Sequence, residues 1–243
     1  MPVKISMKYS SKSDRFNSML TNIREMELYN PANADITMEA LASFRDKLNV
    51  ADKNVIEANI ATKKARDSRK FAYADGESSV DTIFKGINTA VQSQYGKPSI
   101  QHSLIDSVLN QMKYKTSVVE SKVVNSSENS ENETVSKTYH YGDRSYGIKL
   151  ETLNGCITTL SSFGNYLPGN PNLTIDFLTS KANAVSELNS AVIVKRFEER
   201  QLRKTRADLY VDLSMRYKKI KTHISTVYGK SSLQYQIISS YAL

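Results

Sequence analysis

The sequence predicts an all-α protein: an internally duplicated helical bundle with a central β-hairpin or linker between its two copies. Three observations support this prediction: motifs that recur in the same order, apolar residues at helical spacing, and few residues that break helices. The 243 residues include only 9 Gly and 5 Pro, with 40% hydrophobic and 24% charged residues, as is typical of a well-packed chain. We place the first helical repeat unit at 11–114, the insertion at 115–147 and the second unit at 148–243.

Three motifs occur twice, which indicates a tandem duplication. The pairs are Tyr29-Asn-Pro-Ala-Asn33 and Tyr166-Leu-Pro-Gly-Asn170, Arg66-x-x-Arg69-x-x-x-Tyr73 and Arg203-x-x-Arg206-x-x-x-Tyr210, and Tyr95-Gly-Lys-x-Ser99 and Tyr228-Gly-Lys-x-Ser232. The first two pairs are 137 residues apart and the third is 133 apart, so the second copy lacks four residues. The copies are expected to fold alike and to pack on each other, but duplication alone specifies no activity.

The first helix of each copy is expected at about 14–28 and at the equivalent part of the second copy. Its apolar residues have helical spacing. They are Phe16, Met19, Leu20 and Ile23, matched by Leu153, Cys156, Ile157 and Leu160. Cys156 is the only cysteine, which excludes an intramolecular disulfide and a zinc site built on several thiolates. We interpret it as a buried, unreactive thiol.

A long helix follows in each copy, at about 37–74 and 174–210, with Thr37 and Thr174 as N-caps. In the first copy, a 3-4-3-4-3 spacing is typical of lengthwise helix packing, and the residues are Leu41, Phe44, Leu48, Ala51, Val55 and Ala58. The second copy interrupts this pattern with two lysines. We therefore predict a bundle whose neighbouring helices cover a wider stripe that includes Ile56, Ile60, Ile193 and Phe197. A break near Asn49 or Asn189 is compatible with the pattern.

A separate third helix and a short fourth helix are expected to complete each copy, joined by a tight corner. Glycine ends the third helix because it readily adopts positive φ, serine caps the fourth helix, and tyrosine fixes the corner to the core. These structural turn residues are Tyr95, Gly96 and Ser99, and Tyr228, Gly229 and Ser232.

The segment between the copies has a different composition. Residues 116–124 and 134–141 are rich in β-branched and aromatic residues, and the polar run 125–132 separates them. This pattern favours a β-hairpin with a solvated tip. A disordered linker is the alternative, since Ser, Asn and Glu are common in such segments.

The net charge of +8 lies mostly in 36–74 and 173–243. Two basic stripes could hold an anionic partner, and a basic run with interleaved Tyr and Ile follows the second stripe. The candidate residues are Lys63, Arg66, Arg69, Arg200, Arg203, Lys204, Arg206, Lys218, Lys219 and Lys221. The alternative is that these side chains pair with neighbouring acids on solvated helix faces.

No catalytic, metal or cofactor signature is present: His102, His140 and His223 have no ligand spacing among them, and no small-molecule substrate is evident. We therefore expect a non-enzymatic structural or protein-interaction module, with another protein or a second copy as partner. A basic module that binds nucleic acid is the first alternative, and a membrane-acting helical protein the second. The N-terminal residues lack the apolar core of a secretory signal. Together with the single cysteine, this predicts a cytoplasmic protein.

Overall fold

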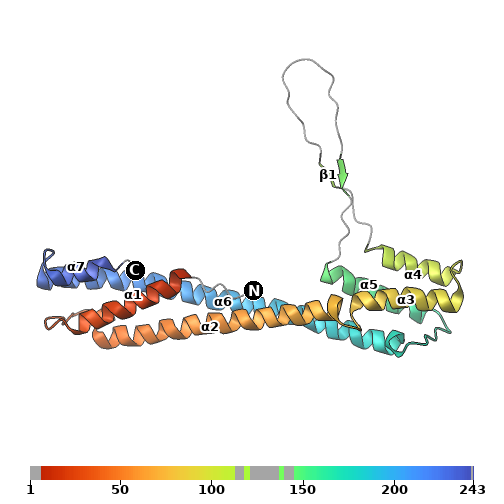
Figure 1. Ribbon diagram of the computed structural model, residues 1–243, viewed down its shortest axis with the longest axis horizontal. Helices are drawn as coiled ribbons and strands as arrows, with labels where there is room; N and C mark the ends of the chain where they lie inside the picture. The colour runs from red at the N-terminus through yellow and green to blue at the C-terminus, as the bar shows by residue number, and fades with distance from the viewer. Residues whose placement is uncertain (1–6, 113–117, 121–136, 140–144, 242) are drawn as a thin grey trace, which may run out of the picture. The chain divides into compact units, whose positions relative to one another are not determined.

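The computed structural model describes residues 7–112, 118–120, 137–139, 145–241 and 243. Nearly all of these residues lie in helices, as predicted (Figure 1). In chain order the elements are α1 (Met7–Arg24), the 3₁₀ helix η1 (Ala34–Ile36), α2 (Met38–Lys70), the π-helix η2 (Phe71–Asp75), α3 (Val80–Tyr95), α4 (Ile100–Asn110), β1 (Val118–Glu120), β2 (Lys137–Tyr139), α5 (Tyr146–Ser161), the 3₁₀ helix η3 (Pro171–Leu173), α6 (Ile175–Tyr228) and α7 (Leu233–Ser240).

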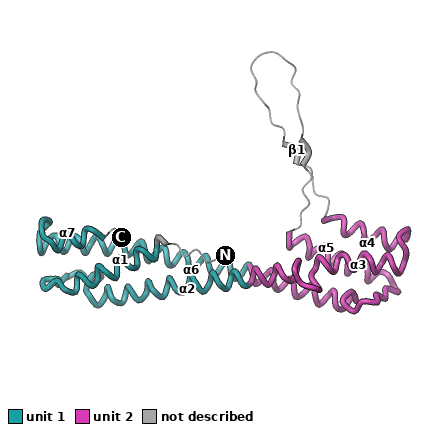
Figure 2. Tube along the Cα trace, in the orientation of Figure 1, with its two compact units in different colours: residues 1–64, 193–243 teal, residues 65–192 magenta. Residues whose placement is uncertain are grey.

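The chain forms two compact units (Figure 2), and their bounds differ from the predicted 11–114 and 148–243. Unit 1 consists of residues 1–64 and 193–243, and unit 2 of residues 65–192. Each unit therefore combines the first part of one predicted copy with the second part of the other. Helix length explains the difference, because the 54 residues of α6 extend over roughly 80 Å. One small core cannot cover such a helix, so its two parts pack into different units.

The core of unit 1 receives apolar side chains from α1, α2, α6 and α7. They include Phe16, Met19 and Ile23 of α1, Leu41, Phe44 and Leu48 of α2, Leu213, Ile220 and Ile224 of α6, and Ile238 of α7. The Tyr217 hydroxyl donates a hydrogen bond to the Ile238 carbonyl oxygen at 2.9 Å, which ties α7 to α6. Burial of each Leu, Ile or Phe side chain contributes roughly 1.5–3 kcal/mol, so this shared core is the main source of stability in unit 1.

The core of unit 2 is built by α3, α4, α5 and the first part of α6. Its residues include Ile83, Phe84, Ile87 and Val91, Ile105 and Leu109, Leu153 and Leu160, and Leu178 and Val185. Lys149 of α5 and Asp81 of α3 form an ion pair at 2.7 Å. Cys156 is fully buried, as predicted, and burial raises the pKa of its thiol to about 12. The thiol therefore stays protonated and unreactive near neutral pH.

The two predicted glycine corners are present. Gly96 and Gly229 have φ of +83° and +85°, values that favour glycine because a Cβ would crowd the backbone. The Ser99 hydroxyl caps α4 by accepting the His102 N–H at 3.1 Å. Ser232 caps α7 through the Tyr235 N–H at the same distance. Both pairs of predictions are confirmed.

The corner tyrosines bind the turns that follow α5 and α1. The Tyr95 hydroxyl donates to Asn165 Oδ1 at 3.0 Å, and the Tyr228 hydroxyl accepts the Leu28 N–H at 2.8 Å. In each case the tyrosine belongs to one predicted copy and its partner to the other. These contacts fix the corners within unit 2 and unit 1, respectively.

The starts of the two long helices also agree with the prediction. The Thr37 hydroxyl accepts the Ala40 N–H at 3.2 Å, and the Thr174 hydroxyl accepts the Phe177 N–H at 3.4 Å. Helix α1 begins at Met7 and ends at Arg24, before the predicted end at residue 28. It ends there because the chain turns tightly, with hydrogen bonds between residues three apart at 22–29.

The predicted third helix of the second copy is wrong as a separate element, because α6 continues without a break to Tyr228. The first copy does break at this point: the π-helix η2 ends at Asp75, and α3 begins at Val80. The intervening Gly76–Ser79 coincides with the four residues that the second copy lacks. Ser79 starts the new helix by accepting the Thr82 N–H at 3.3 Å. The insertion therefore accounts for the difference between the copies.

Within the predicted insertion, β1 and β2 pair as antiparallel strands, with Val118 opposite Tyr139 and Glu120 opposite Lys137. The polar run 125–132, expected to form the tip of a hairpin, lies outside the described residues. The same is true of most of 115–147.

Candidate functional site

Arg206 and Tyr210, from the second copy of the repeated Arg–Tyr motif, form a buried cluster in unit 1. The Arg206 guanidinium carbon lies 4.3 Å from the centre of the Tyr9 ring, and Nη1 lies 3.7 Å from Asp52 Oδ1. The Tyr210 hydroxyl donates to Asp52 Oδ2 at 2.7 Å, and its ring lies 4.6 Å from that of Tyr9. Burial and then the Asp52 carboxylate raise the pKa of Tyr210. A cation, two rings and a carboxylate are thus joined inside the unit.

Arg69 and Tyr73 form the corresponding cluster in unit 2. The Arg69 guanidinium carbon lies 4.1 Å from the centre of the Tyr146 ring, and the Tyr73 and Tyr146 rings lie 4.8 Å apart. Here the Tyr73 hydroxyl accepts the Asn189 Nδ2–H at 2.9 Å. Asn189 is 137 residues after Asp52, so a neutral amide occupies the place of the carboxylate. Burial is the largest cause that raises the pKa of Tyr73.

These clusters determine what Arg69 and Arg206 can do. Only 8% of Arg206 is exposed, and Arg69 is half-buried. Each guanidinium is stacked on a ring, an arrangement worth about 0.5–2 kcal/mol. Two of the ten candidate residues therefore serve internal packing instead of presenting a cation to a partner.

Some of the remaining candidates are paired with acids or rings on the surface. Arg203 donates to Glu199 Oε1 at 2.6 Å and 2.8 Å through Nη2 and Nε. Lys219 lies 2.6 Å from Asp35, and this hydrogen bond lowers the pKa of Asp35. The Lys221 ammonium lies 5.3 Å from the Tyr217 ring. These pairs match the expectation of solvated helix faces.

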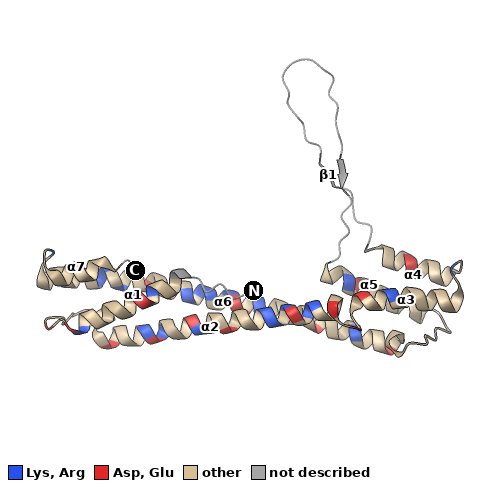
Figure 3. Ribbon diagram, viewed as in Figure 1, with Lys and Arg blue, Asp and Glu red and all other residues tan. Residues whose placement is uncertain are grey.

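The other candidates have exposed side chains and belong to two helices. They are Lys63 and Arg66 of α2, and Arg200, Lys204 and Lys218 of α6. Basic side chains follow both helices, with acidic ones among them (Figure 3). Lys218 and Lys221 also line an open hollow of about 550 Å³ together with Lys230, Tyr217 and Tyr235. This hollow is the most basic concave surface among those found in the described part of unit 1.

A row of large apolar side chains is exposed on α6. The exposed fractions are 68% for Ile193, 61% for Phe197, 61% for Val211 and 51% for Met215. On α2, Ile60 is 53% exposed. The prediction that neighbouring helices cover Ile60, Ile193 and Phe197 is therefore wrong. The reason is that few helices surround this part of α6: its inward side chains, such as Leu213, pack on α1 and α2, and its outer side has no neighbour among the described residues.

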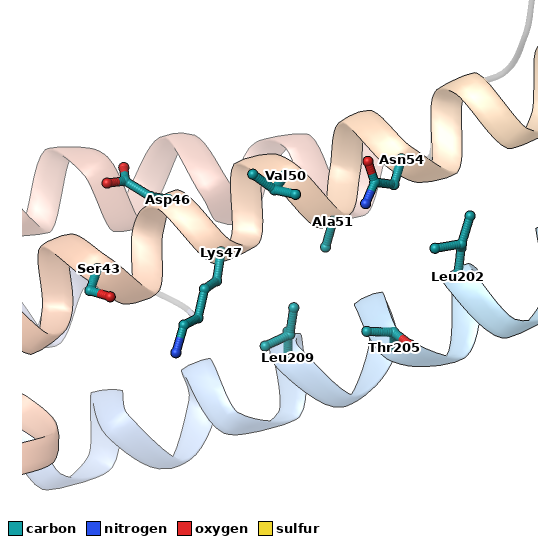
Figure 4. A pocket seen from close by; sticks show the side chains of 9 residues that line it. All are labelled: Ser43, Asp46, Lys47, Val50, Ala51, Asn54, Leu202, Thr205 and Leu209. Atoms are coloured by element: carbon teal, nitrogen blue, oxygen red, sulfur yellow. The ribbon is translucent and has the colours of Figure 1, made fainter.

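An open groove of about 680 Å³ lies between α2 and α6 within unit 1 (Figure 4). Its lining is Ser43, Asp46, Lys47, Val50, Ala51 and Asn54 from α2, and Leu202, Thr205 and Leu209 from α6. The aliphatic side chains offer dispersion contacts, and only Asp46 and Lys47 carry charge. A groove of this kind suits an apolar surface better than a reacting substrate.

Two further searches limit the chemistry of the described residues. Among them, no group of three or more His, Cys, Asp and Glu side chains is arranged to hold a metal ion. No helix in the described ranges combines the length and apolar character that crossing a membrane requires. Comparison of the chain with protein-family models, curated proteins and solved structures found no match.

Proposed function

We propose that the chain is a non-enzymatic helical interaction module, built from two copies that exchange their halves. The function rests mainly on one observation: Ile193, Phe197, Val211 and Met215 are more than half exposed on α6. A contiguous apolar surface is costly in water and marks an interaction site more often than an ordinary surface. The same helix is strongly charged elsewhere, so this apolar row contrasts with its surroundings.

The proposed exchange is supported by three pairs of contacts at matching offsets. Arg69 stacks on Tyr146 as Arg206 does on Tyr9. Tyr73 binds Asn189 as Tyr210 binds Asp52, and Tyr95 binds Asn165 as Tyr228 binds Leu28. Every one of these contacts joins a residue of the first copy to a residue of the second. This is the pattern of a domain-swapped homodimer whose chains have been fused.

Nucleic-acid binding is the alternative, and the hollow that contains Lys218, Lys221 and Lys230 is its best support. A polyanion would need several free cations along its path. Arg206 is buried against Tyr9, and Arg203 is paired with Glu199, which weakens that path on α6. The interaction module is therefore the better explanation.

Light scattering after size exclusion, at low and high salt, tests the proposal. A clean protein whose oligomeric state persists at high salt supports it, because apolar contacts do not weaken with ionic strength. Co-purified nucleic acid that absorbs at 260 nm and dissociates with salt would contradict it. Substitution of Lys218, Lys221 and Lys230 by Gln should then abolish that binding.

A further inference from the structure

The outer face of α6 has a symmetrical arrangement of residues. Starting at Ile193, every third or fourth residue lies on the same side of the helix, opposite the buried Arg206 and Leu213. These residues are Ile193, Phe197, Arg200, Lys204, Asp208, Val211 and Met215, and all seven are exposed. Their spacing is 4-3-4-4-3-4, which reads the same in both directions from Lys204.

The chemistry of this face is also symmetrical about Lys204. Two apolar residues lie at each end, namely Ile193 and Phe197 before the centre and Val211 and Met215 after it. Between them, a cation at Arg200 corresponds to an anion at Asp208. A face with this order is complementary to itself when a second copy runs in the opposite direction.

We propose that this face docks on the same face of a second copy of the chain, with the two α6 helices antiparallel and a twofold axis at Lys204. The inference rests on the proposed function, to which it adds the partner and the contact surface. All seven residues belong to unit 1, so one compact unit supplies the whole surface.

The antiparallel register brings complementary groups together. It places Ile193 opposite Met215 of the second copy and Phe197 opposite its Val211, each pair occurring twice by symmetry. Arg200 meets Asp208 of the second copy, a pair that can form two parallel hydrogen bonds. Counted at 1.5 Å per residue, the contact extends over roughly 33 Å of helix. The alternating three- and four-residue steps are those of helices that pack lengthwise.

Lys204 is the one residue that the pairing does not favour, because it meets its own copy at the axis. Its long stem can cover apolar surface while the ammonium reaches water, so the repulsion weakens the contact without preventing it. Lys204→Met should therefore tighten the dimer, by about 5-fold in Kd. The presence of Asp208 on the same face argues against a polyanion or an anionic lipid surface as its partner.

Variants of the purified full-length chain test the surface. Phe197→Glu alters both halves of the contact and should raise the dimer Kd by at least about 10-fold in sedimentation experiments. Leu233→Glu is the matched control, since Leu233 is 67% exposed in the same unit but lies on α7. Arg200→Asp alone should weaken the dimer, and the double variant Arg200→Asp with Asp208→Arg should restore it. Restoration also shows that the variants fold.

A cross-linking experiment tests the register. With Lys204→Cys, a short bis-maleimide should join two chains at the axis. Lys218→Cys is the control, because it is exposed on the same helix but 14 residues from the axis, which separates the two cysteines by roughly 40 Å. Cys156 is buried in both variants and should not react.

The possible outcomes separate this inference from the proposed function. Cross-linking at residue 204 and not at 218, with loss of the dimer in Phe197→Glu, supports the pairing. Either a clean monomer at all concentrations or a dimer unaffected by Phe197→Glu overturns the pairing but leaves an interaction module. Co-purified nucleic acid that dissociates with salt overturns the proposed function itself.

Discussion

The difference between Asp52 and Asn189 gives the sharpest test of the two arginine–tyrosine clusters. In unit 1 the Arg206 charge lies 3.7 Å from the Asp52 carboxylate, and the side chains are only 9% and 24% exposed. Asp52→Asn removes the negative charge and keeps the shape. The amide can still bind the Tyr210 hydroxyl, as Asn189 binds Tyr73 at 2.9 Å. The substitution therefore isolates the contribution of the charge.

We expect Asp52→Asn to lower the free energy of unfolding by about 2 kcal/mol. Loss of one partner from a buried ion pair costs about 3–5 kcal/mol, but here the pair is partly exposed and the amide keeps a hydrogen bond worth about 1 kcal/mol. For a chain of this size, the expected fall in Tm is about 4–8 °C. The reciprocal Asn189→Asp supplies Arg69 with a carboxylate and should raise stability by about 1 kcal/mol.

Urea unfolding followed by circular dichroism measures both changes, with an unchanged m-value as the sign that only stability has altered. Asp46→Asn is the control, because Asp46 lies on the same helix, pairs with Arg45 and has a side chain that is 66% exposed. It should change stability by less than about 0.5 kcal/mol. A neutral result for Asp52→Asn, with no gain from Asn189→Asp, would refute the view that the carboxylate compensates the buried guanidinium.

Three further predictions concern the corner, the thiol and the tyrosines. Gly229→Val should cost about 1–2 kcal/mol in thermal unfolding, because φ is +85° and a Cβ there meets no atom within 4 Å, leaving backbone strain as the cause. Gly164→Ala, also in open space, should be nearly neutral, and equal effects would contradict the role of φ. Cys156 should react with a colorimetric thiol reagent only after denaturation, since burial raises its pKa to about 12; rapid reaction of the native protein would show that the thiol is accessible. Burial also raises the pKa of Tyr166 to about 12, so the unfolded chain ionises this tyrosine first. Its contribution to stability is complete below pH 10 and should be lost as the pH rises to about 12, which an ultraviolet titration against urea midpoints would detect; a constant midpoint over that range would exclude it.

Features set by neighbouring residues could be predicted from the sequence, whereas features set by distant partners could not. Gly96, Gly229, Ser99 and Ser232 act within one turn, so the corners and caps were predictable. Helical spacing also identifies the inward side of α1 and α2. It does not say which helix lies opposite, and the exposure of Phe197 depends on that.

The fate of Arg69 and Arg206 shows the same limit. Their partners Tyr146 and Tyr9 are distant in sequence and lie in segments outside the repeated motifs. A signal was nevertheless present, because the two tyrosines are 137 residues apart, the offset of the arginines themselves. Comparison of every residue with the one 137 positions later would also have identified Asp52 and Asn189.

The composition of the two units has a consequence for the order of folding. Unit 2 is one continuous stretch, 65–192, whereas unit 1 needs residues from 1–64 and 193–243. During synthesis unit 2 can form as soon as its own residues have emerged, since domains fold as units from the N-terminal side. Phe16 and Leu41 must wait for Leu213 and Ile224, which complete their core. The part of the chain made first is therefore among the last to be protected, and contacts this distant in sequence form slowly.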